Sequence, residues 1–155
     1  MVTRAMYEEK KKQLNHIMDV EVPANSKEIE YALSLGDLRE NAEYKAAKEK
    51  QEQLNSQVAK LKEDIDRAQL FDPNSVNVTK VSFGTKVVLL NETTEQREEY
   101  TIFGPWESNP DNNIISYLSP RGSAILNKEA GERFEFVLNN ERVPYLVEKI
   151  TPAEI

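Results

Sequence analysis

The sequence predicts an α+β fold, in which an N-terminal antiparallel coiled-coil hairpin is followed by a small antiparallel sheet with one short helix. Residues 3–70 contain a single glycine, Gly36, and are rich in Glu, Lys, Gln, Ala and Leu, which favour helix. Residues 71–77 contain proline and turn formers, and the hydrophobic pattern after them changes to a period of two, which is typical of strands. We therefore expect two domains, at residues 1–72 and 78–155.

The first domain is expected to be two helices that turn back at Gly36, with the tip at residues 35–41. The second helix, expected over residues 37–69, has apolar side chains three and four residues apart, which is the pattern of a coiled-coil seam. These side chains are Tyr44, Ala47, Leu54, Val58, Leu61, Ile65 and Ala68, with Gln51 in register. Because neither helix has an apolar face wide enough for a bundle, we expect the two to pack on each other.

The first helix has a poorer seam. It is formed by Leu14, Met18, Val22, Ile29 and Ala32. Pro23 interrupts this seam, and because proline lacks a backbone donor and clashes with the preceding turn, we expect a kink or short break there. Asn25 and Glu28 are spaced as a capping pair that would restart the helix.

The second domain is expected to be a sheet, because it consists of β-branched and aromatic runs separated by turn residues. These runs are residues 81–91, 97–104, 112–119, 132–138 and 142–150. Asn139 and Asn140, between the last two runs, are typical of a two-residue hairpin turn. Ser119 as an N-cap and Pro120 at the first helical position predict a short helix that continues to about Asn127.

The composition excludes several classes of protein. A net charge of −7 repels phosphate backbones and anionic lipids, so we expect no autonomous DNA or RNA binding and no membrane binding. Without cysteine there is no disulfide or thiolate metal site, and the single histidine, His16, cannot build a zinc site. No apolar run approaches the roughly 20 residues that span a bilayer, and we expect a cytoplasmic location.

Two carboxylates mark the turn of the predicted hairpin. Asp37 and Glu40 are three residues apart, which places both on one side of the first turn of the second helix. A helix-capping box has this spacing, and both charges suit the positive end of a helix. Magnesium prefers oxygen ligands and is often held by one or two carboxylates together with a phosphate. The pair therefore also suits a magnesium site that another protein and a nucleic acid would complete.

The run GDLRENAEYKAA, which begins at Gly36, resembles the tip signature of the Gre transcript cleavage factors. Further similarities to that family are the position of Pro23 before the tip and, near the C-terminus, Ser119-Pro120, Lys128 and Gly131-Glu132. The resemblance covers nearly the whole chain. It implies that the N-terminal coiled coil enters the secondary channel of RNA polymerase and that residues 78–155 form an FKBP-like domain that docks near the channel entrance.

This resemblance implies an accessory factor for transcription elongation rather than an enzyme. Such a factor stimulates the Mg²⁺-dependent hydrolysis of backtracked RNA by the polymerase and thereby rescues arrested complexes. Asp37 and Glu40 would hold the second Mg²⁺ and its attacking water. That magnesium is shared with the polymerase active site, so we expect no metal in the free protein.

The resemblance also assigns roles to the neighbours of these acids. Gly36 and Asn41 would shape the tip, and Tyr44 would contact the polymerase or the RNA. Lys45 and Lys48 are candidates for contact with the 3′ end of the nascent RNA. Such lysines are also typical of solvated helix faces.

Other positions concern docking and the departures from the family. Ser119 and Pro120 would lie at the surface that docks on the polymerase. Leu33 stands where the family commonly has a basic residue, and with Leu35 it leaves two apolar side chains near the tip that would contact the polymerase. Asn127 replaces a family glycine and can still adopt the left-handed conformation at a helix end.

Two other functions stay open beside cleavage stimulation. One is a channel-binding regulator of the same fold that inhibits the polymerase, although the intact pattern of Asp37, Glu40 and Asn41 argues against it. The other is a non-catalytic coiled-coil adaptor or an FKBP-like prolyl isomerase module. Isomerase activity would require an apolar, aromatic-lined peptide pocket.

Overall fold

The computed structural model describes residues 1–37 and 41–154, which form two compact units. One unit is the helical hairpin, Ala5–Ala68. The other is the sheet unit, which consists of Met1–Arg4 and the chain from Gln69 onward. The predicted hairpin domain of residues 1–72 thus includes two short segments, at its start and its end, that the structure groups with the sheet.

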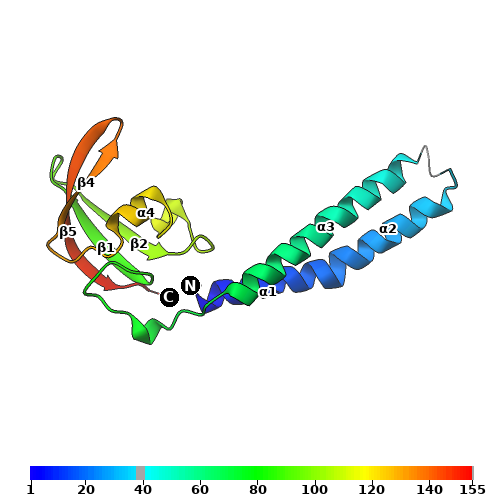
Figure 1. Ribbon diagram of the computed structural model, residues 1–155, viewed down its shortest axis with the longest axis horizontal. Coiled ribbons are helices and arrows are strands. Elements are labelled where there is room, and N and C mark those ends of the chain that lie inside the picture. The colour runs from blue at the N-terminus through cyan, green and yellow to red at the C-terminus, as the bar shows by residue number, and fades with distance from the viewer. Residues whose placement is uncertain (38–40, 155) are drawn as a thin grey trace. The chain divides into compact units, whose positions relative to one another are not determined.

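The hairpin has one interrupted arm and one continuous arm (Figure 1). The first arm consists of α1 (Arg4–His16), a π-helical turn (Ile17–Glu21) and α2 (Val22–Ser34). The second arm is α3 (Ala42–Arg67), whose 26 residues extend about 39 Å at ~1.5 Å per residue. α3 is shorter than the predicted helix of residues 37–69 because it begins after the tip.

The seam of α3 agrees with the predicted one. Along α3 and its C-cap Ala68, the residues Ala47 and Leu54 are buried, and the other predicted seam residues are half-buried: Tyr44, Gln51, Val58, Leu61, Ile65 and Ala68. The fully buried side chains of α3 are therefore seven residues apart, at Ala47 and Leu54. The heptad spacing identified the packed face of this helix correctly.

The seam of the first arm differs from the prediction at Met18, which is 41% exposed, while Ile17 is buried. The cause is the π-helical turn, in which the amide of Val22 donates to the carbonyl of Ile17, five residues back. The extra residue in this turn changes which side chains face α3. The expected interruption near Pro23 is found as this π-helical turn, which ends two residues before Pro23; the backbone stays helical, and Pro23 lies in the first turn of α2.

The predicted capping role of Asn25 is also wrong. No side chain caps α2, and Asn25 is instead one of the most buried residues of the hairpin. Its Nδ2 donates to the carbonyl oxygen of Ala47 on α3 at 3.0 Å. Asn25 therefore joins the two arms through a buried polar contact.

In its described residues, the sheet unit contains five strands and one α-helix. They are β1 (Thr85–Asn91), β2 (Arg97–Phe103), β3 (Ile114–Ser116), α4 (Pro120–Ile125), β4 (Arg133–Leu138) and β5 (Glu141–Pro152), with short 3₁₀ turns at Pro73–Ser75 and Pro110–Asn112. The strand order is β3-β2-β1-β5-β4. All neighbours are antiparallel except β2 and β3, which pair in parallel, so the predicted sheet is antiparallel at all but one edge.

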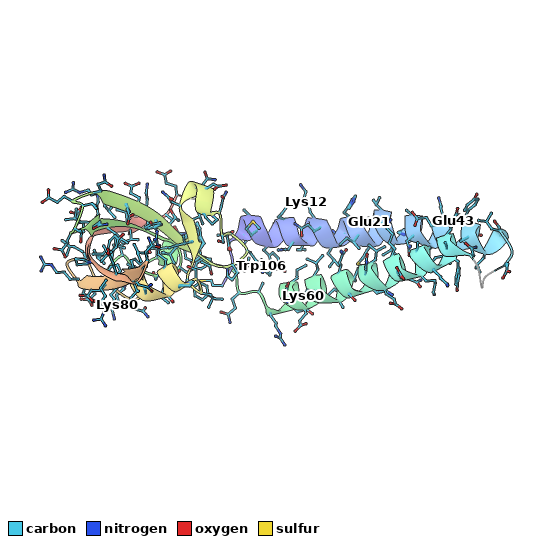
Figure 2. The ribbon with its side chains drawn as sticks, turned by 90° about the horizontal axis from the view of Figure 1, so that it is seen from above. Lys12, Glu21, Glu43, Lys60, Lys80 and Trp106 are labelled. Atoms are coloured by element: carbon cyan, nitrogen blue, oxygen red, sulfur yellow. The ribbon has the colours of Figure 1, made fainter. Side chains whose placement is uncertain are left out.

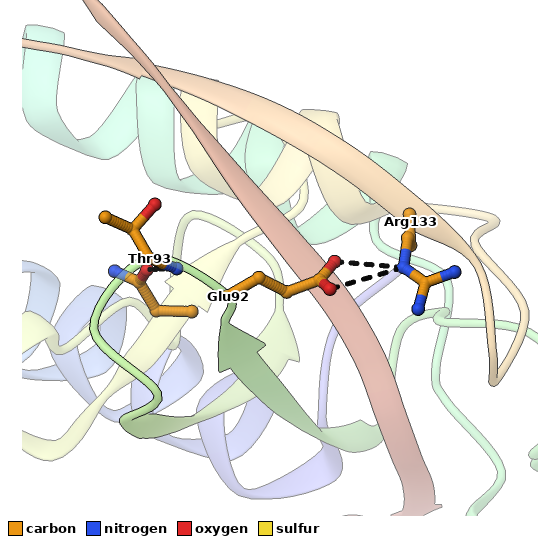
Figure 3. Close-up of polar contacts among 4 residues, drawn as sticks. Glu92, Thr93 and Arg133 are labelled. Carbon is orange, nitrogen blue, oxygen red and sulfur yellow. Dashed lines mark hydrogen bonds and ion pairs between the residues drawn. The ribbon is translucent and has the colours of Figure 1, made fainter.

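Asn139 and Asn140 form the turn between β4 and β5, as predicted. Both have positive φ angles, of 51° and 65°, which the tight turn requires and asparagine tolerates. On the exposed side of the sheet, Arg133 of β4 donates from Nε to both carboxylate oxygens of Glu92, at 3.1 and 3.3 Å (Figure 3). Glu92 lies in the turn after β1, and because β5 lies between β1 and β4, this ion pair connects β4 to the end of a strand that is not its neighbour.

The core of the sheet unit lies between the sheet and α4. Its fully buried side chains include Val81, Val87, Leu89, Ile102, Ile125, Tyr145 and Val147. Gly122 allows α4 to approach closely, since a Cβ at this position would lie 2.0 Å from the carbonyl oxygen of Ser116. Asn127 has a φ of 67°, which confirms the expected left-handed conformation after the helix.

The first residues of the chain belong to the sheet unit because they pair with the segment after α3. Val2 donates to the carbonyl of Gln69, and Phe71 donates to the carbonyl of Val2, each at 2.8 Å. Phe71 is buried and packs edge-to-face on Phe83, with 5.0 Å between ring centroids. The segment predicted as a linker is thus partly anchored in the sheet unit.

Candidate functional site at the hairpin tip

The turn of the hairpin begins where α2 ends. The amide of Leu35 donates to the carbonyl of Ala32 at 3.2 Å, and the amide of Gly36 donates to the carbonyl of Leu33 at 3.4 Å. Gly36 has a φ of +101°, a backbone conformation that residues with a Cβ rarely adopt. The glycine at this position therefore lets the chain leave the helix abruptly toward Asp37.

Asn41 holds the other side of the turn. Its Oδ1 accepts from the amide of Tyr44 at 3.0 Å, which makes Asn41 the N-cap of α3. Its Nδ2 donates to the carbonyl oxygen of Ala32 on α2 at 2.6 Å. One side chain thus caps α3 and connects it to the end of α2, and in this sense it shapes the tip.

This cap overturns the interpretation of Asp37 and Glu40 as a capping box. α3 begins at Ala42, so Asp37 is too far from its first turn to cap it. Asp37 is exposed and directly follows Gly36. Glu40, the second predicted acid, lies outside the described residues.

The side chains around the tip are of mixed chemistry. Tyr44 is half-buried, and Lys45 and Lys48 are exposed on α3. The Nζ of Lys48 donates to Oε1 of Gln51 at 2.9 Å. On α2, Leu33 is 48% exposed.

Within residues 1–37 and 41–154, no group of three or more His, Asp and Glu side chains is placed to bind a metal. The donors that the tip itself offers are carboxylate oxygens, of which Asp37 is the described one. Such oxygen donors are of the type that magnesium prefers. The described part of the tip thus supplies one carboxylate of this donor type, that of Asp37.

The sheet unit carries a second candidate surface, a cavity of about 710 Å³ beside α4. Its lining combines aromatic, aliphatic and polar side chains: Tyr100, Pro110, Asn113, Ile115, Ser119, Pro120, Arg121, Ala124, Glu135, Phe136, Val137 and Leu138. The predicted docking residues Ser119 and Pro120 are thus brought together at one edge of a cavity. Ser119 is also structural, since its Oγ accepts from the amide of Gly122 at 3.0 Å.

Sequence reasoning missed the aromatic wall of this cavity. The guanidinium carbon of Arg121 lies 5.3 Å from the ring centroid of Tyr100 and 5.5 Å from that of Phe136, and Nη1 donates to the Tyr100 hydroxyl. Burial raises the pKa of Tyr100, and the positive charge of Arg121 opposes this shift. The period-two burial of β2 and β4 could have placed both rings on one face, but it could not have placed Arg121 between them.

In the part of the chain that the structure describes, no helix is both long and apolar enough to cross a membrane.

Comparisons with known proteins match both units. The family described as "Transcription elongation factor, N-terminal" matches residues 1–70, and the family described as "Transcription elongation factor, GreA/GreB, C-term" matches residues 76–152. Transcription elongation factor GreA of Treponema pallidum (strain Nichols) is 52% identical over 155 residues, covering 100% of this chain and 96% of that protein. Transcription elongation factor GreA of Nautilia profundicola is 40% identical over 154 residues, covering 99% and 95%.

Among solved structures, GreA factor homolog 1 of Thermus thermophilus is similar with a TM-score of 0.44 and 22% identity, covering 97% of each chain. The sequence matches carry the assignment, since they include relatives above 30% identity over nearly the full length of this chain. The chain belongs to the GreA/GreB family of transcription elongation factors.

Proposed function

We propose that this chain binds RNA polymerase through its secondary channel and stimulates the Mg²⁺-dependent hydrolysis of backtracked RNA, which rescues arrested elongation complexes. Factors of this family act on RNA polymerase as accessory proteins and are not themselves the catalyst. The observation that carries the proposal is the construction of the tip, where Asn41 fixes the helix ends and Asp37 is presented beside them. We further propose a cytoplasmic location, because RNA polymerase acts there.

Asn41, and not an acidic residue, caps α3, and this supports a catalytic role for the acids of the tip. Because Asn41 caps α3, the helix does not require the carboxylate of Asp37 for its start. Asp37 and Glu40 would hold magnesium only when the polymerase and the RNA supply the other ligands. Bound there, the ion would activate water for attack on a phosphodiester. The role of this chain is then to bring carboxylate oxygens and an oriented water to the active site of the polymerase.

Other contacts of the complex follow from charge and exposure. Lys45 and Lys48 are exposed on the first turns of α3, where they can approach the phosphates of the RNA 3′ segment. Ser119 and Pro120 lie at an edge of the cavity beside α4, where an apolar side chain of the polymerase can enter. The net charge of −7 makes contact with RNA dependent on the polymerase.

A second candidate function, prolyl isomerisation, is favoured by the same cavity. Its volume of about 710 Å³ and its aromatic lining suit an apolar peptide segment. A direct isomerisation assay on short proline peptides separates this function from docking. Turnover that persists without polymerase would establish an isomerase, and its absence would leave the cavity a docking surface.

The experiment that tests the main proposal measures RNA release from stalled, backtracked polymerase complexes in the presence of Mg²⁺. The native protein is compared with Asp37→Ala and with Asp19→Ala, which removes an exposed acid of the same hairpin away from the tip. We expect short 3′ RNA fragments with the native protein and with Asp19→Ala, and loss of release with Asp37→Ala while polymerase binding persists. Normal cleavage by Asp37→Ala would overturn the mechanism. Binding of the native protein without release would favour the inhibitory regulator.

A further inference from the structure

The two flanks of the hairpin near its tip differ in chemistry. One flank has a groove of about 310 Å³ between α2 and α3, whose lining residues are Glu28, Tyr31, Glu43, Ala46, Ala47 and Lys50. By helical periodicity, Tyr44 and Lys48 lie on the opposite flank of α3. The first flank is aromatic and mainly acidic, whereas the second carries the basic side chains proposed to approach RNA.

The aromatic part of the groove is highly exposed. Tyr31 is 61% exposed and Leu35 is 51% exposed. Leu35, the C-cap of α2, follows Tyr31 by four residues and so lies on the same side of the helix end, outside the groove lining. Ala46 and Ala47 have small side chains, so the opposite wall leaves room beside the ring of Tyr31. This face offers a flat ring with open space next to it, which suits a planar group.

The charges of the groove favour a cation. Lys50 pairs with Glu28, with 3.7 Å between Nζ and Oε1. Glu43 adds a second carboxylate, so the acids of the groove outnumber its one base. Glu43 lies near the loop end of α3 (Figure 2), in the first turn of the helix. A phosphate would meet two carboxylates here, whereas a guanidinium would meet a carboxylate and a ring face, the two partners it prefers.

We propose that this groove binds an arginine side chain of the polymerase, with the guanidinium over the ring of Tyr31 and against the carboxylate of Glu43. The inference rests on the proposed function and deepens it, because it names the flank of the hairpin that faces protein. RNA then lies along the other flank, beside Lys48. The asymmetry would determine which flank of the hairpin faces protein in the channel and which faces RNA.

The test measures affinity and cleavage separately on backtracked polymerase complexes. Affinity is measured by fluorescence anisotropy of the labelled protein, and cleavage at saturating protein. We expect Tyr31→Ala to weaken binding about tenfold, the middle of the range for a cation–ring contact, and Tyr31→Phe to bind like the native protein. Glu43→Gln should weaken binding and reduce its salt dependence. Each variant should cleave at the native rate once saturated.

The matched control is Glu30→Gln, which removes an exposed carboxylate of α2 outside the groove and should leave affinity unchanged. A photo-crosslinker placed at position 31 identifies the neighbour directly, and we expect a polymerase peptide that contains arginine. Unchanged affinity in both Tyr31→Ala and Glu43→Gln, or a crosslink to RNA, would overturn the assignment. Because binding is read without cleavage, a native protein that binds but does not cleave would refute the proposed function and leave this inference standing.

Discussion

The substitution Asn41→Ala isolates the contact that holds the tip. In the native protein, Oδ1 of Asn41 accepts from the amide of Tyr44 and Nδ2 donates to the carbonyl of Ala32. Loss of the cap costs about 1 kcal/mol, and loss of the second hydrogen bond costs about another 1 kcal/mol. Together they favour local opening of the turn by about 2 kcal/mol, which corresponds to a factor of about 30 in the opening equilibrium.

Hydrogen exchange followed by NMR measures this opening. We expect the amide of Lys45, whose acceptor is the backbone carbonyl of residue 41 and is kept in the variant, to exchange about 30-fold faster in Asn41→Ala, whereas the amide of Leu54, in the middle of α3, should be unaffected. Asn41→Asp retains the acceptor and loses the donor, so it should change the free energy of local opening by about half as much as Asn41→Ala does. Asn55→Ala, an exposed asparagine of α3 that caps nothing, is the control. Exchange at Lys45 within about twofold of native in Asn41→Ala would refute the reasoning.

Three further predictions concern stability. Gly122→Ala should lower the free energy of unfolding of the sheet unit by about 3 kcal/mol in urea titrations, because the new Cβ would lie 2.0 Å from the carbonyl oxygen of Ser116. Asn25→Leu should raise the melting temperature of the hairpin and yield oligomers in sedimentation, because the polar contact with Ala47 that specifies the pairing is lost; a monomer with native stability would contradict this. Burial, and secondarily a hydrogen bond with Glu98, raises the pKa of Tyr145, so its contribution to stability is complete below about pH 10, the unfolded value, and is lost as pH rises through the folded pKa. Tyr145→Phe should therefore show a shallower decline of the urea midpoint between about pH 10 and 12, and an unchanged slope would exclude this origin.

The regular parts of this fold could be predicted from the sequence because their patterns are local. The heptad spacing of α3 and the turn at Asn139 and Asn140 each follow from a few consecutive residues, and both were found where expected. The π-helical turn could not be predicted, because its extra residue changes the helix face without changing composition. The partner of Asn25 could not be predicted either, since an asparagine after proline is equally typical of a cap and only the packing against α3 makes it a seam residue.

The candidate site was predicted in part for the same reason. Gly36 marks the turn through its conformational freedom, which is a local property. The cap was assigned to Asp37 when it belongs to Asn41, because several consecutive residues of the tip can cap a helix and the choice depends on where α3 begins. The roles of Asp37 and Glu40 in metal binding stay predictions that the cleavage assay decides.

The pairing of Val2 with the segment around Leu70 has a consequence for how the protein acquires its structure during synthesis. The hairpin consists of contacts between residues close in sequence, and helical hairpins of this kind form quickly. The sheet unit uses residues from both sides of the hairpin. Because β5 lies between β1 and β4, the sheet cannot be completed until β5 has left the ribosome. Formation of the hairpin brings Arg4 and Gln69 toward each other and thereby shortens the effective loop that the sheet unit must close. The coiled coil would in this way act as a folding template for the unit into which it is inserted.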